Sequence, residues 1–407
     1  MIRNSKNPTK DERLNRRPYT CVVCDSTDIE IFMEIPQVPV YCNVLWPTRE
    51  AALNSPMADM QLGFCRSCGH IYNFAFDPAK LDYTLDYENS LHFSPRFQEY
   101  ARTLADRLIT RHNLYAKDII EIGCGSGDFL KLLCEMGGNR GVGFDPSSAF
   151  DRSDNSIEKE IIFVKNHYSE HYAGYKADLI CCRHVLEHIQ SPLSFLRRLR
   201  RTVDHQTSTV IFFEVPNVLF SLRDQGIWDL IYEHCSYFTG KSLAEAFTRA
   251  GFTVTSLTEL FEGQFLNIEA CMDSPPNSLA IPPQDHLEEI AKYVQLFHRN
   301  FTERLEFWRN KVDKMAQEGR SAVIWGAGSK GVMFLNALED HQHIQGVIDI
   351  NPNKQGKYIA GTGQRILPPE SLRESQPDVV IVMNPIYITE IRLIVEQMRL
   401  ASNVISV

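Results

Sequence analysis

The chain has 407 residues, of which 43% are hydrophobic and 23% are charged, and its formal net charge is −9. These proportions are typical of a folded globular protein, and the length predicts two to three domains. The negative charge argues against a nucleic-acid partner, and no apolar run reaches the roughly 20 residues that span a bilayer. Residues 1–17 are polar and basic and lack the apolar core of a signal peptide, so we expect a cytoplasmic protein whose 11 cysteines are reduced.

Two C-x-x-C pairs lie near the N-terminus, Cys21 with Cys24 and Cys65 with Cys68. Paired thiolates at this spacing can surround one zinc ion tetrahedrally. Four cysteine ligands leave no open coordination position, so the pattern predicts a structural zinc ion rather than a catalytic one. We therefore expect a small zinc-binding domain over residues 18–80.

Residues 118–129 read as a buried strand, a glycine-rich turn and the start of a helix. Such a turn exposes backbone N–H groups to a ligand, and an acid at the end of the next strand can accept both ribose hydroxyls. The E-x-G-x-G-x-G spacing resembles motif I of class I S-adenosylmethionine-dependent methyltransferases. The resemblance implies that the cofactor is held by Glu121, Gly123, Gly125, Gly127 and Asp145.

Three further strands are expected over residues 161–164, 177–182 and 209–217. Asn166 follows the first of them and could bond an adenine edge, although a turn-forming role is the alternative. The run from Asp178 to Ile189 resembles the fourth-strand motif of class I methyltransferases and contains His184 and His188. Ligands of open α/β sheets bind beyond the carboxyl ends of the strands. We therefore add His184 to the cofactor site and expect Glu214 at the same edge.

A second centre of chemistry lies in the loop over residues 228–239, which contains Tyr232, Glu233 and His234. Histidine accepts protons near neutral pH, and a carboxylate can orient it. The alternative is a buried loop whose polar groups satisfy one another. A helix over 241–250 and an antiparallel strand pair over 252–260 and 265–272 should complete the central domain, residues 81–280.

The segment over residues 77–100 is polar and aromatic, and it either covers an active site or serves as a packed linker. A helix over 95–111 follows. Near the C-terminus, an amphipathic helix over 285–319 precedes a G-x-G-x-x-G run from Gly326 to Gly331, with Asp349 at the end of the next strand. Alone, this run predicts a nicotinamide or flavin site. Because the unit is short, we favour a Rossmann-like lid within a domain over residues 281–407.

The order of these parts resembles the nucleotide-sugar C-methyltransferases, which methylate a carbon atom of a nucleotide-linked keto-deoxysugar. The resemblance implies an α/β fold with a zinc-binding domain, a methyltransferase sheet whose last strand is antiparallel, and a smaller Rossmann-like domain. It also implies His234 as the base beside Glu233, His188 near the substrate, and catalytic tyrosines at Tyr232 and Tyr87, with Tyr83 as the alternate to Tyr87.

One departure concerns the acceptor. Many of these enzymes carry an extra residue between the tyrosine and the glutamate, which Tyr232 and Glu233 here lack. The acceptor can therefore differ from a deoxysugar. An O- or N-methyltransferase remains an alternative, and an NAD-dependent oxidoreductase or a non-catalytic scaffold is the alternative from another class. We expect a small-molecule partner and a monomer or homodimer.

Overall fold

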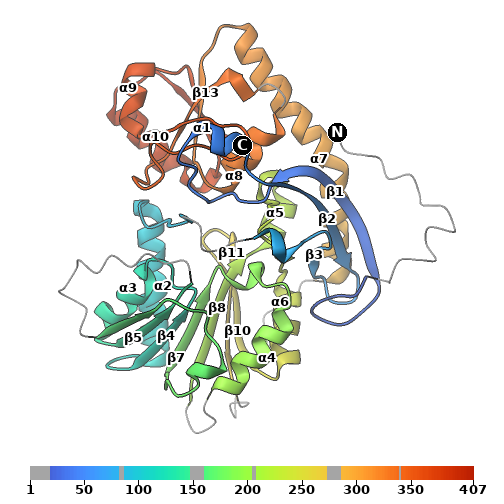
Figure 1. The fold of residues 1–407 in the computed structure, drawn as a ribbon, viewed down its shortest axis with the longest axis vertical. Helices are drawn as coiled ribbons and strands as arrows, with labels where there is room; N and C mark the ends of the chain where they lie inside the picture. Colours follow the sequence, from blue (N-terminus) through green and yellow to red (C-terminus); the bar gives the residue numbers. More distant parts are fainter. Residues whose placement is uncertain (1–18, 82–86, 147–159, 204–207, 273–285, 339–340) are drawn as a thin grey trace, which may run out of the picture.

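The computed structural model describes residues 19–81, 87–146, 160–203, 208–272, 286–338 and 341–407. The polar and basic residues 1–17 and Tyr83, the alternate to Tyr87, lie outside these ranges. The described chain forms three β-sheets, and helices cover the two larger ones (Figure 1). Among the described helices, none combines the length and the apolar character that crossing a bilayer requires.

The N-terminal sheet has the order β1-β2-β3-β9 and is antiparallel throughout. Its first three strands are β1 (Ile29–Pro39), β2 (Met57–Cys65) and β3 (Ile71–Asn73), with helix α1 (Arg49–Leu53) between β1 and β2. The fourth strand, β9 (Ser236–Tyr237), comes from the loop that contains His234. The N-terminal sheet is therefore completed by a segment of the central part of the chain.

The central sheet has seven strands in the order β10-β11-β8-β7-β4-β5-β6. The parallel strands are β4 (Asp118–Ile122), β5 (Arg140–Phe144), β6 (Ile161–Val164), β7 (Leu179–Arg183) and β8 (Val210–Pro216). Strand β11 (Phe265–Cys271) pairs antiparallel with both β8 and β10 (Thr253–Leu260). The predicted methyltransferase sheet with an antiparallel strand near its end is thus confirmed.

Strand periodicity explains how this sheet buries both faces. Ile119, Leu179 and Phe212 point to the face covered by α2 (Pro95–His112) and α3 (Asp128–Gly137). Ile120 and Ile180, one position along, pack on the other face beneath α4 (Pro192–Thr202) and α6 (Gly240–Ala250). Successive side chains of a strand alternate between faces, so a continuous apolar run produces a strand buried on both sides.

The C-terminal sheet is parallel, with the order β14-β13-β12-β15-β16. Its elements are β12 (Ala322–Trp325), α8 (Ser329–Ala337), β13 (Ile344–Ile348), β14 (Ile366–Leu367), α9 (Leu372–Ser375), β15 (Val379–Val382), α10 (Ile388–Gln397) and β16 (Asn403–Ser406). The predicted Rossmann-like unit is therefore present.

Helix α7 (Leu287–Gln317) connects the three parts of the molecule. It runs from the C-terminal sheet to the N-terminal strands (Figure 1) and packs on β1 and on α5 (Val218–Arg223). One apolar cluster joins residues from the N-terminal sheet, α5, α7 and the C-terminal sheet. The boundaries at residues 18–80, 81–280 and 281–407 stay predictions, and this shared core predicts that the parts do not move independently.

Candidate active site

The turn between β4 and α3 forms a backbone cradle at the carboxyl edge of the central sheet. Gly123, Gly125 and Gly127 all have positive φ angles, of 70°, 53° and 79°. A Cβ on Gly123 or Gly127 would collide with a neighbouring side chain, whereas one on Gly125 would meet nothing within 4 Å. The Gly125 position therefore faces open space, as a turn that approaches a ligand requires. Asp145 supports this turn, because its Oδ2 accepts a hydrogen bond from the Gly125 amide at 2.9 Å.

Glu121 lies beneath this cradle, with only 3% of its surface exposed. Its Oε2 has no hydrogen-bond partner among the described residues. Burial raises the pKa of the carboxyl to about 8, although the nearby Arg183 guanidinium opposes the shift. An orphaned acidic oxygen beside an open glycine turn suits a ligand with hydroxyl or ammonium donors, and S-adenosylmethionine carries both.

The other predicted cofactor residues lie farther along the same edge. Asn166 is exposed just beyond β6, and its side-chain amide donates to the Tyr172 hydroxyl at 3.0 Å. His184 instead forms part of a cavity wall and lies 3.0 Å from Glu214 Oε1. Burial alone would lower the pKa of His184, but the Glu187 and Glu214 carboxylates raise it to about 9.

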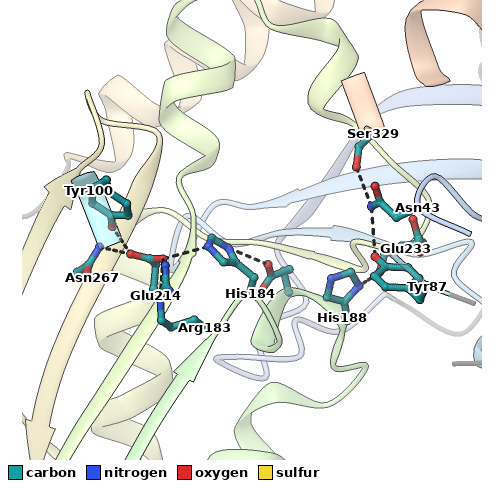
Figure 2. Close-up of polar contacts among 11 residues, drawn as sticks. Asn43, Tyr87, Tyr100, Arg183, His184, His188, Glu214, Glu233, Asn267 and Ser329 are labelled. Atoms are coloured by element: carbon teal, nitrogen blue, oxygen red, sulfur yellow. Dashed lines mark hydrogen bonds and ion pairs between the residues drawn. The ribbon is translucent and has the colours of Figure 1, made fainter. Parts of the chain in front are cut away.

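Glu214 anchors a buried polar network behind His184 (Figure 2). Its carboxylate accepts hydrogen bonds from Arg183, at 2.8 and 3.0 Å, and from Tyr100 and Asn267. Arg183 and His184 together hold the pKa of Glu214 well below its usual range, in spite of burial. A charged and fully bonded group of this kind stiffens its surroundings. Glu214 therefore positions His184 in the cavity wall.

A cavity of about 320 Å³ extends from this wall to the C-terminal sheet. Its lining includes side chains from all three parts of the chain: Asn43, Tyr87, His188, His234, Lys330 and Lys354. The segment around Tyr87 also contributes Asn89, Ser90 and Leu91. Of the two interpretations of residues 77–100, covering a site is the one that these contacts support.

His188 and His234 lie next to each other in the wall of the cavity. Their rings meet edge to face, with centroids 4.8 Å apart and an interplanar angle of 80°. His188 Nδ1 lies 3.0 Å from the backbone oxygen of Glu233 and donates to it (Figure 2). Burial, with a smaller contribution from His188, lowers the pKa of His234 to about 3. His234 is therefore neutral throughout the neutral pH range, and the nearby Glu187 carboxylate favours its protonated form.

The carboxylate nearest to His234 is not the one that the sequence indicated. Glu233 is fully buried, is not among the residues that line the cavity, and accepts a hydrogen bond from the Cys42 amide at 2.9 Å. Glu187 lies in the cavity wall instead, with a carboxylate oxygen within 4.8 Å of the ligating atoms of His188 and His234. The sequence feature that could have indicated Glu187 is its position directly before His188 in the fourth-strand motif.

Tyr232 is likewise placed away from the cavity. It is fully buried, and its hydroxyl accepts from the Asp77 amide at 2.8 Å. This contact supports a structural role rather than the catalytic role predicted for Tyr232. The cavity contains Tyr237 instead, whose hydroxyl donates to the Ile231 carbonyl at 2.8 Å.

The four N-terminal cysteines converge as their spacing predicts. All four Sγ atoms lie within 4.8 Å of one another, and the Cys21–Cys68 and Cys24–Cys65 pairs are 3.6 and 3.5 Å apart. These separations are too long for disulfides. They approach the value of about 3.8 Å that tetrahedral Zn–S bonds would produce. The donor set and its geometry fit a zinc ion.

The comparisons with known proteins match the two larger parts of the chain. A family model for a methyltransferase domain matches residues 94–257, and a model for a C-methyltransferase C-terminal domain matches residues 283–403. The chain is an S-adenosylmethionine-dependent methyltransferase. These matches cover the glycine cradle, both cavity histidines and the C-terminal glycine loop, and they support the C-methyltransferase type.

The similar curated proteins include the C-methyltransferase NovU of Streptomyces niveus, which is 26% identical over 307 residues, or 72% of each chain. A tRNA U34 carboxymethyltransferase of Nautilia profundicola is 34% identical over 93 residues, 22% of this methyltransferase and 31% of that protein.

Similar solved structures include magnesium protoporphyrin IX methyltransferase from Synechocystis, with 16% identity and a TM-score of 0.35. That match covers 47% of this methyltransferase and 91% of the other chain. The 1,6-didemethyltoxoflavin-N1-methyltransferase from Burkholderia thailandensis has 16% identity and a TM-score of 0.34, over 43% and 80% of the two chains.

Proposed function

We propose that the protein methylates a carbon atom next to a ketone. The acceptor in this proposal is a small molecule, such as a keto-deoxysugar, that is linked to a nucleoside diphosphate. The observation that carries this proposal is the extent of the cavity. One continuous space contains a neutral histidine pair at one end and, at the other, a glycine loop with one buried and one partly buried lysine. The first end suits proton abstraction, and the second suits a phosphate group.

His234 serves as the base in this proposal. Its neutral ring accepts the acidic proton beside the carbonyl, and the carboxylate of Glu187 stabilises the imidazolium that forms. A hydrogen-bond donor at the enolate oxygen comes from Tyr87, which lines the same space. S-adenosylmethionine, held by the cradle at Gly123 to Gly127, supplies the electrophilic methyl group.

The opposite end of the cavity is built for an anion. Helix α8 begins at Ser329, directly after the glycine loop, and no side chain caps its first turn. Exposed N–H groups and the helix dipole attract phosphate at such a position. Lys354 lies beside Gly328 and is only 6% exposed, and its ammonium group has no hydrogen-bond or ion-pair partner among the described residues. A buried ammonium group without a counter-ion is costly, so a bound anion would relieve it.

Lys330 adds a second cation to this end of the cavity. It sits in the first turn of α8, where a positive charge is unfavourable unless an anion is near. It forms an ion pair with Asp229, and burial lowers its pKa to about 7. The carboxylate of Asp349 is engaged by the Ala327 and Asn351 amides, which disfavours the ribose contact of a dinucleotide site. We therefore favour acceptor binding over the lid or the nicotinamide site for this unit.

We also infer that the four-cysteine cluster binds a structural zinc ion. The site lies next to the sheet that β9 completes, so the metal would stabilise the loop that contains His234 indirectly. No step of the reaction requires it.

The test of the function is methyl transfer from isotopically labelled S-adenosylmethionine to a panel of keto-sugar nucleotides, with the product analysed by mass spectrometry and NMR. A new carbon–methyl bond beside the ketone is expected. Exchange of that position with solvent deuterium, lost in His234→Gln, would support the enolate. A methylated oxygen or nitrogen would instead support the rival transferases, and NAD binding in preference to S-adenosylmethionine would overturn the proposal.

A further inference from the structure

Three side chains in the wall of the cavity have the composition of a metal site. The ligating atoms of Glu187, His188 and His234 all lie within 4.8 Å of one another. Ligands bonded at 2.0–2.2 Å to one metal ion lie about 3 to 4 Å apart, so small side-chain rotations would bring the three into range. The cluster is distinct from the four-cysteine cluster in donor type and in position.

The surroundings of His188 are those of a metal-bound histidine. Its Nδ1 donates to the backbone carbonyl of Glu233, and this assignment puts the lone pair of the ring on Nε2. In metal sites, the ring nitrogen that does not bind the metal commonly donates a hydrogen bond to a backbone carbonyl. This hydrogen bond orients the ligating imidazole and increases its basicity. Glu233 is itself held by the Cys42 amide, so the orientation of His188 depends on a rigid support.

Glu187 supplies the observation that calls for a cation. The side chain is only 2% exposed, and its Oε2 has no hydrogen-bond partner among the described residues. Its Oε1 lies 3.7 Å from His184 Nδ1, which leaves the other oxygen uncompensated. An unsatisfied buried carboxylate oxygen costs on the order of 1–3 kcal/mol, or more when the group is charged. A metal ion at the cluster would satisfy it.

The donor set determines the class of metal. Two imidazoles and one carboxylate suit Zn²⁺, Co²⁺, Ni²⁺ and Fe²⁺, whereas Mg²⁺ and Ca²⁺ prefer oxygen ligands alone. All three residues line the cavity. Water or the acceptor can therefore reach the ion from the cavity and complete its coordination.

We propose that Glu187, His188 and His234 form a second metal site, which binds a divalent transition-metal ion and thereby inhibits methyl transfer. The ion binds to the lone pairs of both imidazoles. Because the lone pair of His234 is the one that accepts the substrate proton, the bound ion blocks proton abstraction. The inhibition rests on the proposed role of His234 as the base, whereas the binding does not.

The test uses the full-length protein with its four-cysteine site already loaded with zinc. Co²⁺ is added, and the visible spectrum is recorded together with the affinity by calorimetry. We expect one Co²⁺ per chain, with weak d–d bands and without the intense near-ultraviolet bands of cobalt–thiolate bonds. His234→Gln and Glu187→Gln should each weaken binding at least tenfold, and the exposed His167→Gln should leave it unchanged.

Retained S-adenosylmethionine binding shows that each variant is folded, and His234→Gln keeps the test decisive if Glu187→Gln fails to fold. Absence of any bound Co²⁺ at millimolar concentration in the zinc-loaded protein, or equal affinity in His234→Gln, overturns the site. Ni²⁺ should inhibit the wild-type enzyme, with recovery when the free and weakly bound Ni²⁺ is removed by gel filtration. Binding without inhibition overturns the inhibitory half of the proposal and the base role of His234, while the metal site stands.

Discussion

The carboxylate of Glu233 accepts a hydrogen bond from the backbone amide of Cys42 at 2.9 Å. This contact joins the loop that contains His234 to the N-terminal part of the chain. Burial raises the pKa of Glu233 to about 7, and the Cys42 amide and the Tyr87 hydroxyl oppose the shift. Glu233 therefore connects the predicted base, the N-terminal part and the segment over the cavity.

This connection predicts different outcomes for two substitutions of Glu233. Glu233→Gln keeps an oxygen that can accept from Cys42, so it should fold normally. Glu233→Ala leaves the buried Cys42 amide unpaired, and we expect it to lower the free energy of unfolding by about 1–3 kcal/mol. Urea denaturation measures both, and equal stability of the two variants would show that the bond contributes little.

Substitution of His234 tests the base directly. We expect His234→Gln to reduce kcat by a factor of about 10² to 10⁴, the usual contribution of general base catalysis. The affinity for S-adenosylmethionine, measured by calorimetry, should stay within twofold, because the glycines of the cradle are not among the residues that line the cavity with His234. His171→Gln, on the exposed surface, is the matched control. Near-normal turnover in His234→Gln would exclude the assignment.

Lys354 tests the phosphate end of the cavity. Lys354→Met keeps the apolar stem and removes the charge, so KM for a diphosphate-linked acceptor should rise at least about tenfold, which corresponds to about 1.4 kcal/mol. Lys357→Met, three residues along and outside the cavity lining, should leave KM unchanged. Steady-state kinetics measure KM for the acceptor in both variants. Equal effects of the two substitutions would remove the phosphate site from the proposal.

The pKa of Glu121 predicts a pH-dependent stability. Burial raises it from 4.5 to about 8, so between these values the folded protein binds more protons than the unfolded chain. Stability contributed by the protonated carboxyl is complete below the unfolded pKa and is lost as the pH rises to about 8. Glu121→Gln should therefore gain at least about 1 kcal/mol over the wild type between pH 5 and 8. The check is urea denaturation of both proteins without cofactor. A constant difference between the urea midpoints of the wild type and Glu121→Gln across this pH range would contradict the assignment.

Metal removal should affect more than the N-terminal part. Chelation of the proposed zinc ion should unfold the sheet around Cys65, and β3 pairs with β9, two residues beyond His234. We therefore expect loss of methyl transfer along with loss of N-terminal structure, and recovery of both on adding Zn²⁺. Hydrogen exchange at residues 236–237 measures the coupling. Full activity in the metal-free protein would show that β9 holds its place without the metal.

Local patterns were sufficient to predict the elements of the fold. The apolar run at Ile119 to Ile122, the glycines after it and the acid at Asp145 specify a strand, a turn and a second strand within a short stretch. The helix expected over residues 95–111 corresponds to α2, and the strand expected over 161–164 to β6. Each of these features depends on residues close in sequence.

The side chains that surround the cavity were harder to predict, because they come from distant parts of the chain. Asn43 donates to the Tyr87 hydroxyl at 3.3 Å and to Ser329 Oγ at 3.2 Å, and no local pattern brings these three together. Glu187 and Glu233 each precede a cavity histidine in the sequence. Only the three-dimensional path of the loop shows which carboxylate enters the cavity.

The two-residue strand β9 also has a consequence for the order in which the protein can be made. Until Ser236 and Tyr237 emerge from the ribosome, β3 presents an open sheet edge, the kind of surface on which chains aggregate. In a nascent chain that pauses before residue 236, the N-terminal cysteines and the unpaired edge of β3 are exposed to solvent. Truncated chains that end before residue 236 should therefore aggregate, and adding back only the zinc ion should not rescue them.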